Sequence, residues 1–364
     1  MKVALVHDWL TGMRGGEKCL EVFCEMFPEA HLYTMLRVPG SVSPVIEKME
    51  IRTSLLQKLP LAAARYRYYL PLFPWIVDAW NTGDEKYDLV LSSCHCVAKG
   101  VKFRNAARRV CYCFTPMRYL WCQTDHYYPG DWKQTALKLA QPPLRRWDLK
   151  SNERVDEFIG ISNHVCERIR RFYGRDAVTV YPPVDNEFFQ LPSESDQPSG
   201  EDFYLMVGAL EPYKRVDLAL EAFRRWGRSL KIIGKGTMLE KFRRAAPANI
   251  EFPGWKSDGE IRDLYRQARA LIFPGEEDFG IVPLEAQACG CPVVAYGAGG
   301  ALETVIENKT GVFFREPTAE SLLKALETLE KTQWDWSKFR AQAERFGRKR
   351  FRREMEKYLK IGAT

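Results

Sequence analysis

Short apolar runs alternate with amphipathic stretches along this chain, and that alternation constrains its fold more than any other feature of the sequence. A run at residues 2–6 is followed by a stretch in which Leu20, Phe23, Cys24 and Phe27 share one side of a helix. Strands that alternate with helices form parallel sheets through right-handed crossovers. We therefore predict an α/β fold, whose further strands in the first half lie at residues 31–36, 87–93, 108–114, 157–161 and 178–181.

The same alternation restarts after a polar segment rich in Pro, Ser and Gly at residues 190–202, which is typical of a linker. A length of 364 residues also favours two hydrophobic cores over one. We predict a first domain at 1–189, a second at 203–336, and a basic helical segment at 337–364 that packs back on the first. The strands predicted in the second domain are 203–207, 229–233, 249–252, 270–273 and 292–296.

The charge balance limits the classes of partner. The chain has 54 basic and 47 acidic residues, a formal net charge of +7, which suits diphosphates or an anionic membrane surface better than nucleic acid. No apolar run reaches the roughly 18 residues of a membrane span, and the first apolar run ends too early for a signal peptide. We therefore expect a cytoplasmic protein that is peripheral to the inner face of the membrane if it contacts one.

The ten cysteines are expected to be free thiols in such a compartment. Three pairs have C-x-C spacing, which places both sulfurs on one face of a strand, and no C-x2-C zinc spacing occurs. We interpret these cysteines as small buried side chains and predict no metal site.

A predicted strand, loop and helix start in the second domain together resemble a ligand site. The strand at 270–273 is followed by a loop at 274–280, Pro283 suits the first turn of the next helix, and Gly290 suits its end. In open α/β sheets, ligands bind at the carboxyl ends of the strands, and the N–H groups of a helix start attract phosphate. This loop is therefore the first candidate for a binding site.

Charged residues surround that loop in the predicted fold. Glu277 and Glu285 are eight residues apart and can each accept hydrogen bonds from vicinal hydroxyls, although Glu285 alone could equally serve the helix dipole. Lys214 and Arg215 follow another predicted strand, where fixed cations could stabilise a diphosphate leaving group, although a solvated lysine is the commoner case. In the first domain, Gly15 and Gly16 would let the backbone approach a ligand closely.

These motifs, with V-Y-P-P-V-D-N-E-F-F at 180–189 and the opening V-H-D-W-L-T-G-M-R-G-G-E-K, resemble the family 4 retaining glycosyltransferases. Glu277 and Glu285 match the E-x7-E signature of that family, and the likeness covers essentially the whole chain. The resemblance implies the GT-B fold, in which two Rossmann-like, doubly wound lobes face a central cleft. Within the family, the chain most resembles bacterial mannosyltransferases of O-antigen and exopolysaccharide assembly.

The resemblance also implies residue roles. It implies that His95, Glu277 and Lys214 serve catalysis, with His95 positioning the transferred sugar, although a structural histidine is the alternative. The donor-binding residues that it implies are Gly15, Gly16, Lys214, Arg215, Glu277, Asp278, Phe279, Gly280, Ile281 and Glu285. The acceptor-side residues that we predict are Asp8, Thr115, Arg118 and Tyr119.

The expected reaction is hexose transfer with retention from a nucleotide-sugar, with GDP-mannose as the first guess, to a polysaccharide or a lipid-diphosphate-linked saccharide. No Asp-x-Asp motif or flanking pair of carboxylates is found, so we expect metal independence, no cofactor, and catalysis by positioning and electrostatics. The alternatives are another GT-B enzyme, such as a phosphorylase or an epimerase, and a non-catalytic nucleotide-sugar-binding protein.

Two positions depart from the family pattern, and one segment stays ambiguous. Relatives often carry arginine where this chain has Ala209, and histidine where it has Phe114, so a diphosphate cation and a cleft histidine are missing. The segment 65–80 mixes arginines with aromatics, which fits a lipid headgroup layer as well as it fits an ordinary core helix with a basic side.

Overall fold

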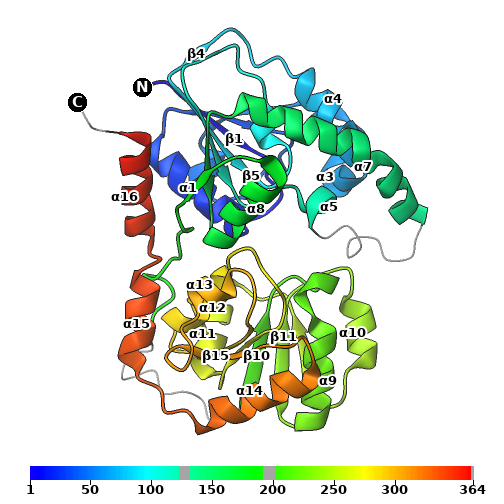
Figure 1. Ribbon diagram of the computed structural model, residues 1–364, viewed down its shortest axis with the longest axis vertical. Helices are drawn as coiled ribbons and strands as arrows, with labels where there is room; N and C mark the ends of the chain where they lie inside the picture. Colours follow the sequence, from blue (N-terminus) through cyan, green and yellow to red (C-terminus); the bar gives the residue numbers. More distant parts are fainter. Residues whose placement is uncertain (123–131, 192–201, 362–364) are drawn as a thin grey trace. The chain divides into compact units, whose positions relative to one another are not determined.

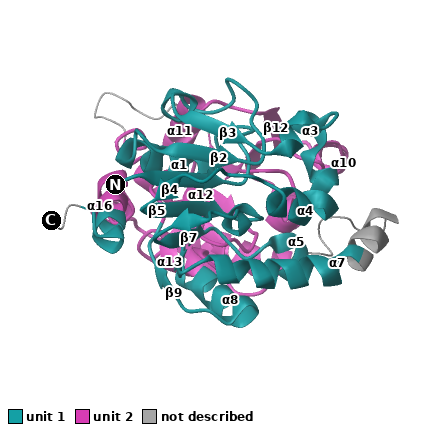
Figure 2. Cartoon of the chain, turned by 90° about the horizontal axis from the view of Figure 1, so that it is seen from above, with its two compact units in different colours: residues 1–181, 354–364 teal, residues 182–353 magenta. Residues whose placement is uncertain are grey.

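The computed structural model describes residues 1–122, 132–191 and 202–361, so most of the predicted linker at 190–202 lies outside the described residues. The chain forms two compact units, which are coloured separately in Figure 2. The first comprises Met1–Tyr181 with Glu354–Thr364, and the second comprises Pro182–Arg353. No helix in the described parts of the chain is long and apolar enough to span a membrane.

The first unit is built on a seven-stranded parallel sheet with the order β3-β2-β1-β5-β7-β8-β9 (Figure 1). The central strands β1 and β5 are buried along their whole length, as predicted for strands covered on both faces. His7 at the end of β1 pairs with Thr34 and with Ser93, so the carboxyl ends of three neighbouring strands are level. The strand bounds are β1 (Val3–His7), β2 (His31–Thr34), β3 (Glu50–Thr53), β5 (Leu89–Cys94), β7 (Arg109–Cys113), β8 (Glu157–Gly160) and β9 (Ala177–Thr179).

The helix predicted after the first strand is present as α1. In α1 the buried residues include Leu20 and Phe23 of the predicted apolar stripe, and the helix packs on β1 and β5. The other α-helices are α2 (Pro44–Glu47), α3 (Ala62–Arg65), α4 (Phe73–Asp78), α5 (Arg118–Trp121), α7 (Trp132–Ser151) and α8 (Asn163–Tyr173), after α1 (Gly15–Met26).

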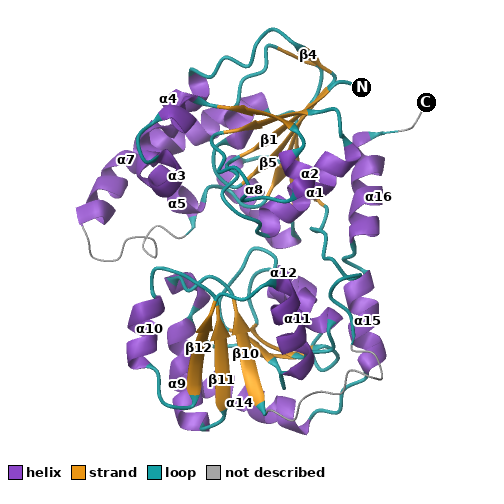
Figure 3. Cartoon of the chain, turned by 180° about the vertical axis from the view of Figure 1, so that it is seen from behind, coloured by secondary structure: helices purple, strands orange, loops and turns teal. Residues whose placement is uncertain are grey.

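The second unit has a six-stranded parallel sheet with the order β12-β11-β10-β13-β14-β15 (Figure 3). Its strands are β10 (Phe203–Val207), β11 (Ser229–Ile233), β12 (Ile250–Gly254), β13 (Leu271–Phe273), β14 (Val293–Tyr296) and β15 (Gly311–Phe314). Its helices are α9 (Val216–Trp226), α10 (Leu239–Ala245), α11 (Asp258–Gln267), α12 (Ile281–Ala288), α13 (Ala301–Thr304), α14 (Ala319–Lys331) and α15 (Trp336–Glu344). The predicted strands are all present, whereas the edge strands β3 and β15 were not predicted.

The C-terminal segment was predicted as one helix that packs on the first domain, and only its last part, Glu354–Thr364, belongs to the first unit. It forms two helices, α15 and α16 (Arg348–Leu359), and α15 packs on α12 of the second unit. The helix is interrupted at Gly347, where a side chain would meet Asn186 at 2.8 Å, and the Val184 N–H donates to the Phe346 carbonyl at 2.8 Å. These contacts hold residues 182–189 on the second unit, so the first unit ends at Tyr181 and not at the predicted residue 189.

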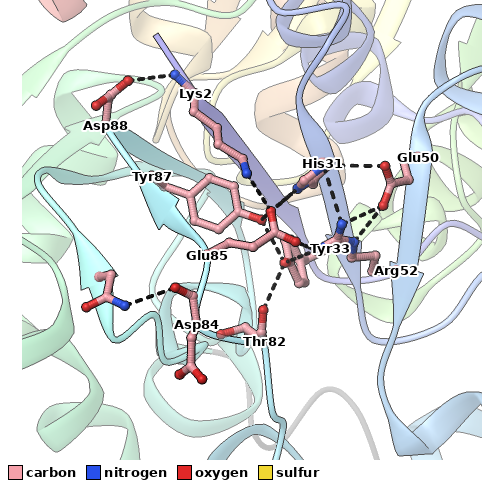
Figure 4. A network of polar contacts seen from close by, with 11 residues as sticks. Lys2, His31, Tyr33, Glu50, Arg52, Thr82, Asp84, Glu85, Tyr87 and Asp88 are labelled. Atoms are coloured by element: carbon pink, nitrogen blue, oxygen red, sulfur yellow. Dashed lines mark hydrogen bonds and ion pairs between the residues drawn. The ribbon is translucent and has the colours of Figure 1, made fainter.

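The amino ends of the first sheet carry a polar network (Figure 4). Arg52 donates to Glu85 at 2.8 Å, Lys2 forms an ion pair with the same carboxylate at 2.8 Å, and His31 lies 2.7 Å from the Tyr87 hydroxyl. Hydrogen bonds from Lys2 and Arg52 lower the pKa of Glu85 from 4.5 to about 2. Because these groups satisfy one another, the opposite edge of the sheet is the better place to look for a ligand site.

Candidate functional site

Two loops of the second unit bring predicted donor residues together. Lys214 lies in the loop after β10, and Glu277 lies in the loop after β13, the neighbouring strand. The Lys214 ammonium donates to the Glu277 carboxylate, and their side chains are 15% and 13% exposed. The ammonium also lies 5.9 Å from the centre of the Phe273 ring. A paired cation and anion therefore occupy the carboxyl edge of this sheet.

Close backbone packing fixes the loop that carries Glu277. A side chain on Gly275 would meet the Tyr213 carbonyl at 2.5 Å, and one on Gly300 would meet the Phe279 Cα at 2.2 Å. The Gly300 N–H donates to the Glu277 carbonyl at 2.8 Å. The loop is therefore held from both sides, and the Gly299–Gly300 turn is a supporting element that the sequence analysis missed. Its signal was a glycine cluster directly after the predicted strand at 292–296.

We predicted that the start of α12 would be open to an anion, but the residues there are largely buried. Gly280 caps the helix with φ of 97°, a conformation that favours glycine. Phe279 is buried, and its ring lies 5.7 Å from that of Phe346. Asp278 and Glu285 are also buried, whereas Ile281 is half-buried. The pKa of Tyr265 is well above its usual value because of burial and then the nearby negative charge of Glu285.

Two further positions at this edge bear on diphosphate binding, namely Arg215 and Ala209. Arg215 has a left-handed backbone with φ of 53° and pairs with Asp217 at 3.3 Å, so it is already engaged within the first turn of α9. Ala209 is exposed at the turn after β10. Beside that turn, the Lys235 carbonyl accepts from the Leu210 N–H at 2.9 Å.

Two further residues at this edge were not predicted. The Lys235 ammonium lies 5.3 Å from the centre of the Trp255 ring, and Trp255 is 63% exposed. Trp255 directly follows β12, and Lys235 is the second residue after β11 in the same sheet. The signals in the sequence were a lysine between two glycines after one predicted strand and an aromatic residue after the next.

In the first unit, the predicted glycines begin α1 at the carboxyl edge of the sheet. A side chain on Gly16 would meet the Phe114 ring at 3.4 Å and the His7 ring at 3.6 Å. Phe114 therefore fills the position of the expected histidine with an apolar ring, 6.4 Å from the ring of His95. His7 itself is buried, with Nδ1 2.8 Å from the Ser93 hydroxyl.

Asp8 is buried, whereas a residue that contacts the acceptor must be accessible to it. Its side chain is fully buried, and its carboxylate accepts hydrogen bonds from the backbone N–H groups of His95, Cys96, Val97 and Ala98. The His95 Nδ1 lies 3.0 Å from the same carboxylate, and the His95 side chain is 32% exposed. The acceptor role predicted for Asp8 is therefore wrong, because its oxygens serve the turn after β5.

The other acceptor-side candidates follow β7, beside Phe114. Thr115 and Tyr119 are buried, and Arg118 at the start of α5 is half-buried. Arg118 is therefore the candidate with the most accessible side chain of these three.

The cysteines fit the prediction of small buried side chains. Nine of the ten are buried, and burial raises the pKa of the Cys94 and Cys111 thiols well above its usual value. Across residues 1–122, 132–191 and 202–361, no group of three or more His, Cys, Asp or Glu side chains converges as a metal site would require.

Comparison with known proteins identifies the second unit. Residues 188–350 match the family described as "Glycosyl transferases group 1", and this range corresponds to the second unit. The second unit is therefore the part of the chain that is similar to this family. The matched range contains the Lys214–Glu277 pair, Gly280 and Glu285, which are the main predicted donor residues.

Individual relatives extend the comparison. An uncharacterized glycosyltransferase of Methanocaldococcus jannaschii is 32% identical over 162 residues, 43% of this chain and 44% of the relative. The O-antigen chain mannosyltransferase C of Escherichia coli is 26% identical over 220 residues, 56% of this chain and 58% of the relative. The chain thus spans about half the length of the curated relatives that it matches.

A solved structure covers both units. The crystal structure of Anabaena HepE in complex with UDP has a TM-score of 0.72 and 20% identity, and the match covers 99% of this chain and 100% of that one. At that identity, the likeness concerns the fold. It confirms the predicted GT-B class with two Rossmann-like lobes.

Proposed function

We propose that this protein is a glycosyltransferase that moves a hexose from a nucleotide-sugar to a saccharide or a lipid-diphosphate-linked acceptor. The observation that carries the proposal is the contact between Lys214 and Glu277 at the carboxyl edge of a group 1 glycosyltransferase unit. A lysine can hold a diphosphate, and a carboxylate can accept hydrogen bonds from sugar hydroxyls. A sugar linked to a diphosphate presents both groups side by side.

The proposed chemistry is electrostatic. Breaking the sugar–phosphate bond leaves a diphosphate, whose developing charge a fixed ammonium can stabilise. Lys214 supplies that ammonium in the loop after β10. We propose retention of configuration and no metal requirement, with the leaving phosphate assisting deprotonation of the acceptor hydroxyl.

The donor proposal rests on the names of two similar proteins. One relative is named a mannosyltransferase, which favours GDP-mannose, whereas HepE was crystallised with UDP. A thermal-shift series with GDP, UDP and ADP separates these donors, because a ligand at a hundred times its Kd stabilises the folded state by about 2.7 kcal/mol. Stabilisation by UDP but not by GDP would reject GDP-mannose.

The function is tested by donor turnover in variants of the contacting pair. Lys214→Ala and Glu277→Ala should each lower the rate roughly 10- to 150-fold, because each removes hydrogen bonds to a charged group. Lys256→Ala is the matched control, since that lysine lies in the same unit and pairs with Glu260 at 2.8 Å on the surface. Turnover that neither site variant changes would refute the site, and nucleotide binding without turnover would favour a non-catalytic protein.

We also propose contact with an anionic membrane surface through residues 51–77, a stretch that contains basic but no acidic residues. Leu61, Tyr68 and Trp75 are 65%, 63% and 64% exposed, which an ordinary core helix does not explain. Exposed aromatics and leucines with nearby arginines suit a headgroup layer. In flotation with anionic vesicles, Trp75→Glu should weaken binding, whereas Trp336→Glu, at a site 50% exposed in the second unit, should not. Absence of vesicle binding by the unaltered chain would reject this proposal.

A further inference from the structure

The carboxylate of Asp8 organises the turn that carries His95. Its Oδ1 accepts from the Val97 and Ala98 N–H groups at 2.7 and 2.8 Å, and its Oδ2 accepts from those of His95 and Cys96 at 2.7 and 3.0 Å. Four backbone donors around one side chain that is 0% exposed form a cage for an anion. A carboxylic acid in this place would turn a proton toward one of those donors, so the geometry requires the ionised form.

The electrostatics of the turn agree with this geometry. Burial alone would raise the pKa of Asp8, but its contacts with the His95 side chain and backbone and the nearby His7 hold that pKa well below its usual value. An ionised carboxylate can only accept hydrogen bonds. The His95 Nδ1, which lies 3.0 Å from the Asp8 Oδ2, must therefore be the donor.

We propose that Asp8 is a positioning residue that holds His95 in the tautomer protonated on Nδ1, so that Nε2 offers a lone pair at the edge of the sheet. The second ring nitrogen is then an acceptor in neutral His95. The group that it recognises is a hydroxyl that donates a hydrogen bond, as the hydroxyls of a hexose do. Only the identification of that group as a sugar hydroxyl rests on the proposed function.

Neighbouring contacts keep the ring and its turn in one place. Trp9 is buried and meets the His95 ring edge to face, with centroids 4.6 Å apart and planes at 85°. Further along the turn, the buried Lys99 ammonium contacts the Asp148 carboxylate at 2.8 Å and the Ser151 hydroxyl at 2.5 Å. The turn is thus tied to the end of β1 through Asp8 and to α7 through Lys99.

Nitrogen NMR of histidine in the full chain, without any donor, tests the proposal directly. The chain has five histidines, so selective labelling with ¹⁵N-histidine gives a simple spectrum, and His95→Gln assigns the signal. The expected result is a proton on Nδ1 of neutral His95. A proton on Nε2 would overturn the proposal, and this measurement needs no variant of Asp8 that folds.

Asp8→Asn gives the second measurement. An amide NH₂ facing Nδ1 donates a hydrogen bond, so His95 should shift toward the tautomer protonated on Nε2. Asp156→Asn is the matched control, because the Asp156 carboxylate also accepts from a backbone N–H, that of Arg109 at 2.7 Å, but at the amino edge of the sheet. A folded Asp8→Asn protein with an unchanged tautomer would contradict the proposal.

The activity readout separates this inference from the proposed function. With a working donor, Asp8→Asn should lower kcat roughly 10- to 100-fold, as expected when a hydrogen bond of a charged group is lost, while Asp156→Asn should not. Normal kcat in an Asp8→Asn protein with a shifted tautomer would reject the catalytic value of the positioning. If the wild-type tautomer is as expected but no donor turns over, the positioning stands and the glycosyltransferase proposal fails.

Discussion

Replacing Gly300 by alanine tests whether backbone packing holds the donor loop. The backbone of Gly300 is helical, with φ of −67° and ψ of −16°, so alanine should be favoured there by about 0.5–1 kcal/mol on conformational grounds. The added carbon, however, would lie 2.2 Å from the Phe279 Cα and 2.4 Å from its carbonyl oxygen. Backbone atoms cannot rotate away, so the overpacking term of about 1–3 kcal/mol should dominate.

The net expectation is a loss of up to about 2.5 kcal/mol in the free energy of unfolding, or a decrease in Tm of up to about 10 °C. Gly259→Ala is the matched control, because Gly259 lies in the first turn of α11 and a side chain there would meet nothing within 4 Å. That control should gain about 0.5–1 kcal/mol. Differential scanning calorimetry of the two variants measures both signs. If Gly300→Ala is as stable as Gly259→Ala, the Gly299–Gly300 turn does not support the donor loop.

Three further predictions concern the first unit. Lys99→Met should lower the unfolding free energy by about 3–5 kcal/mol in urea titrations, since it leaves the buried Asp148 carboxylate without its ion pair. Adding Asp148→Asn should recover part of that loss, and no recovery would contradict the pairing. Glu157→Gln should speed hydrogen exchange at the end of α16, because Glu157 accepts from Tyr358 at 2.7 Å, and unchanged exchange would show that this contact is not needed. The folded pKa of Glu85, about 2, lies below its ordinary 4.5, so the stabilisation from its contacts should be complete above pH 4.5 and disappear as the pH falls to 2. The urea midpoints of the wild type and Glu85→Gln should therefore converge over that range. Parallel profiles would refute the assignment.

Local patterns made the second unit predictable. The strand predicted at 203–207 is β10 as observed, and Gly290 ends α12 with a left-handed φ of 82°. Strand, loop and helix start follow one another in the chain, so their order alone places Lys214 and Glu277 at the ends of strands. That β10 and β13 are neighbours is a property of the doubly wound fold, and the contact between the two side chains follows from it.

Long-range packing made the remainder unpredictable. In the sequence, Asp8 is only a polar residue at the end of a predicted strand. The fold alone shows that its carboxylate accepts hydrogen bonds from N–H groups almost 90 residues later in the chain. The boundary at Tyr181 depends on the Val184 hydrogen bond to Phe346, which no local pattern contains. Edge strand β3 was missed because Glu50 and Arg52 interrupt its apolar character.

The two units prepare their candidate residues by different physical means. In the second unit, Gly275 and Gly300 let neighbouring backbones pack closely against the loop of Glu277. In the first unit, a single buried carboxylate, Asp8, gathers four N–H groups and one imidazole nitrogen. Both devices order a loop during folding, so a ligand that arrives later loses less free energy to loop ordering. The two arrangements are also sensitive to different substitutions. An added methyl group disrupts the glycine packing of the second unit by direct contact. The Asp8 arrangement tolerates a change of shape better than the replacement of an accepting oxygen by a donating nitrogen.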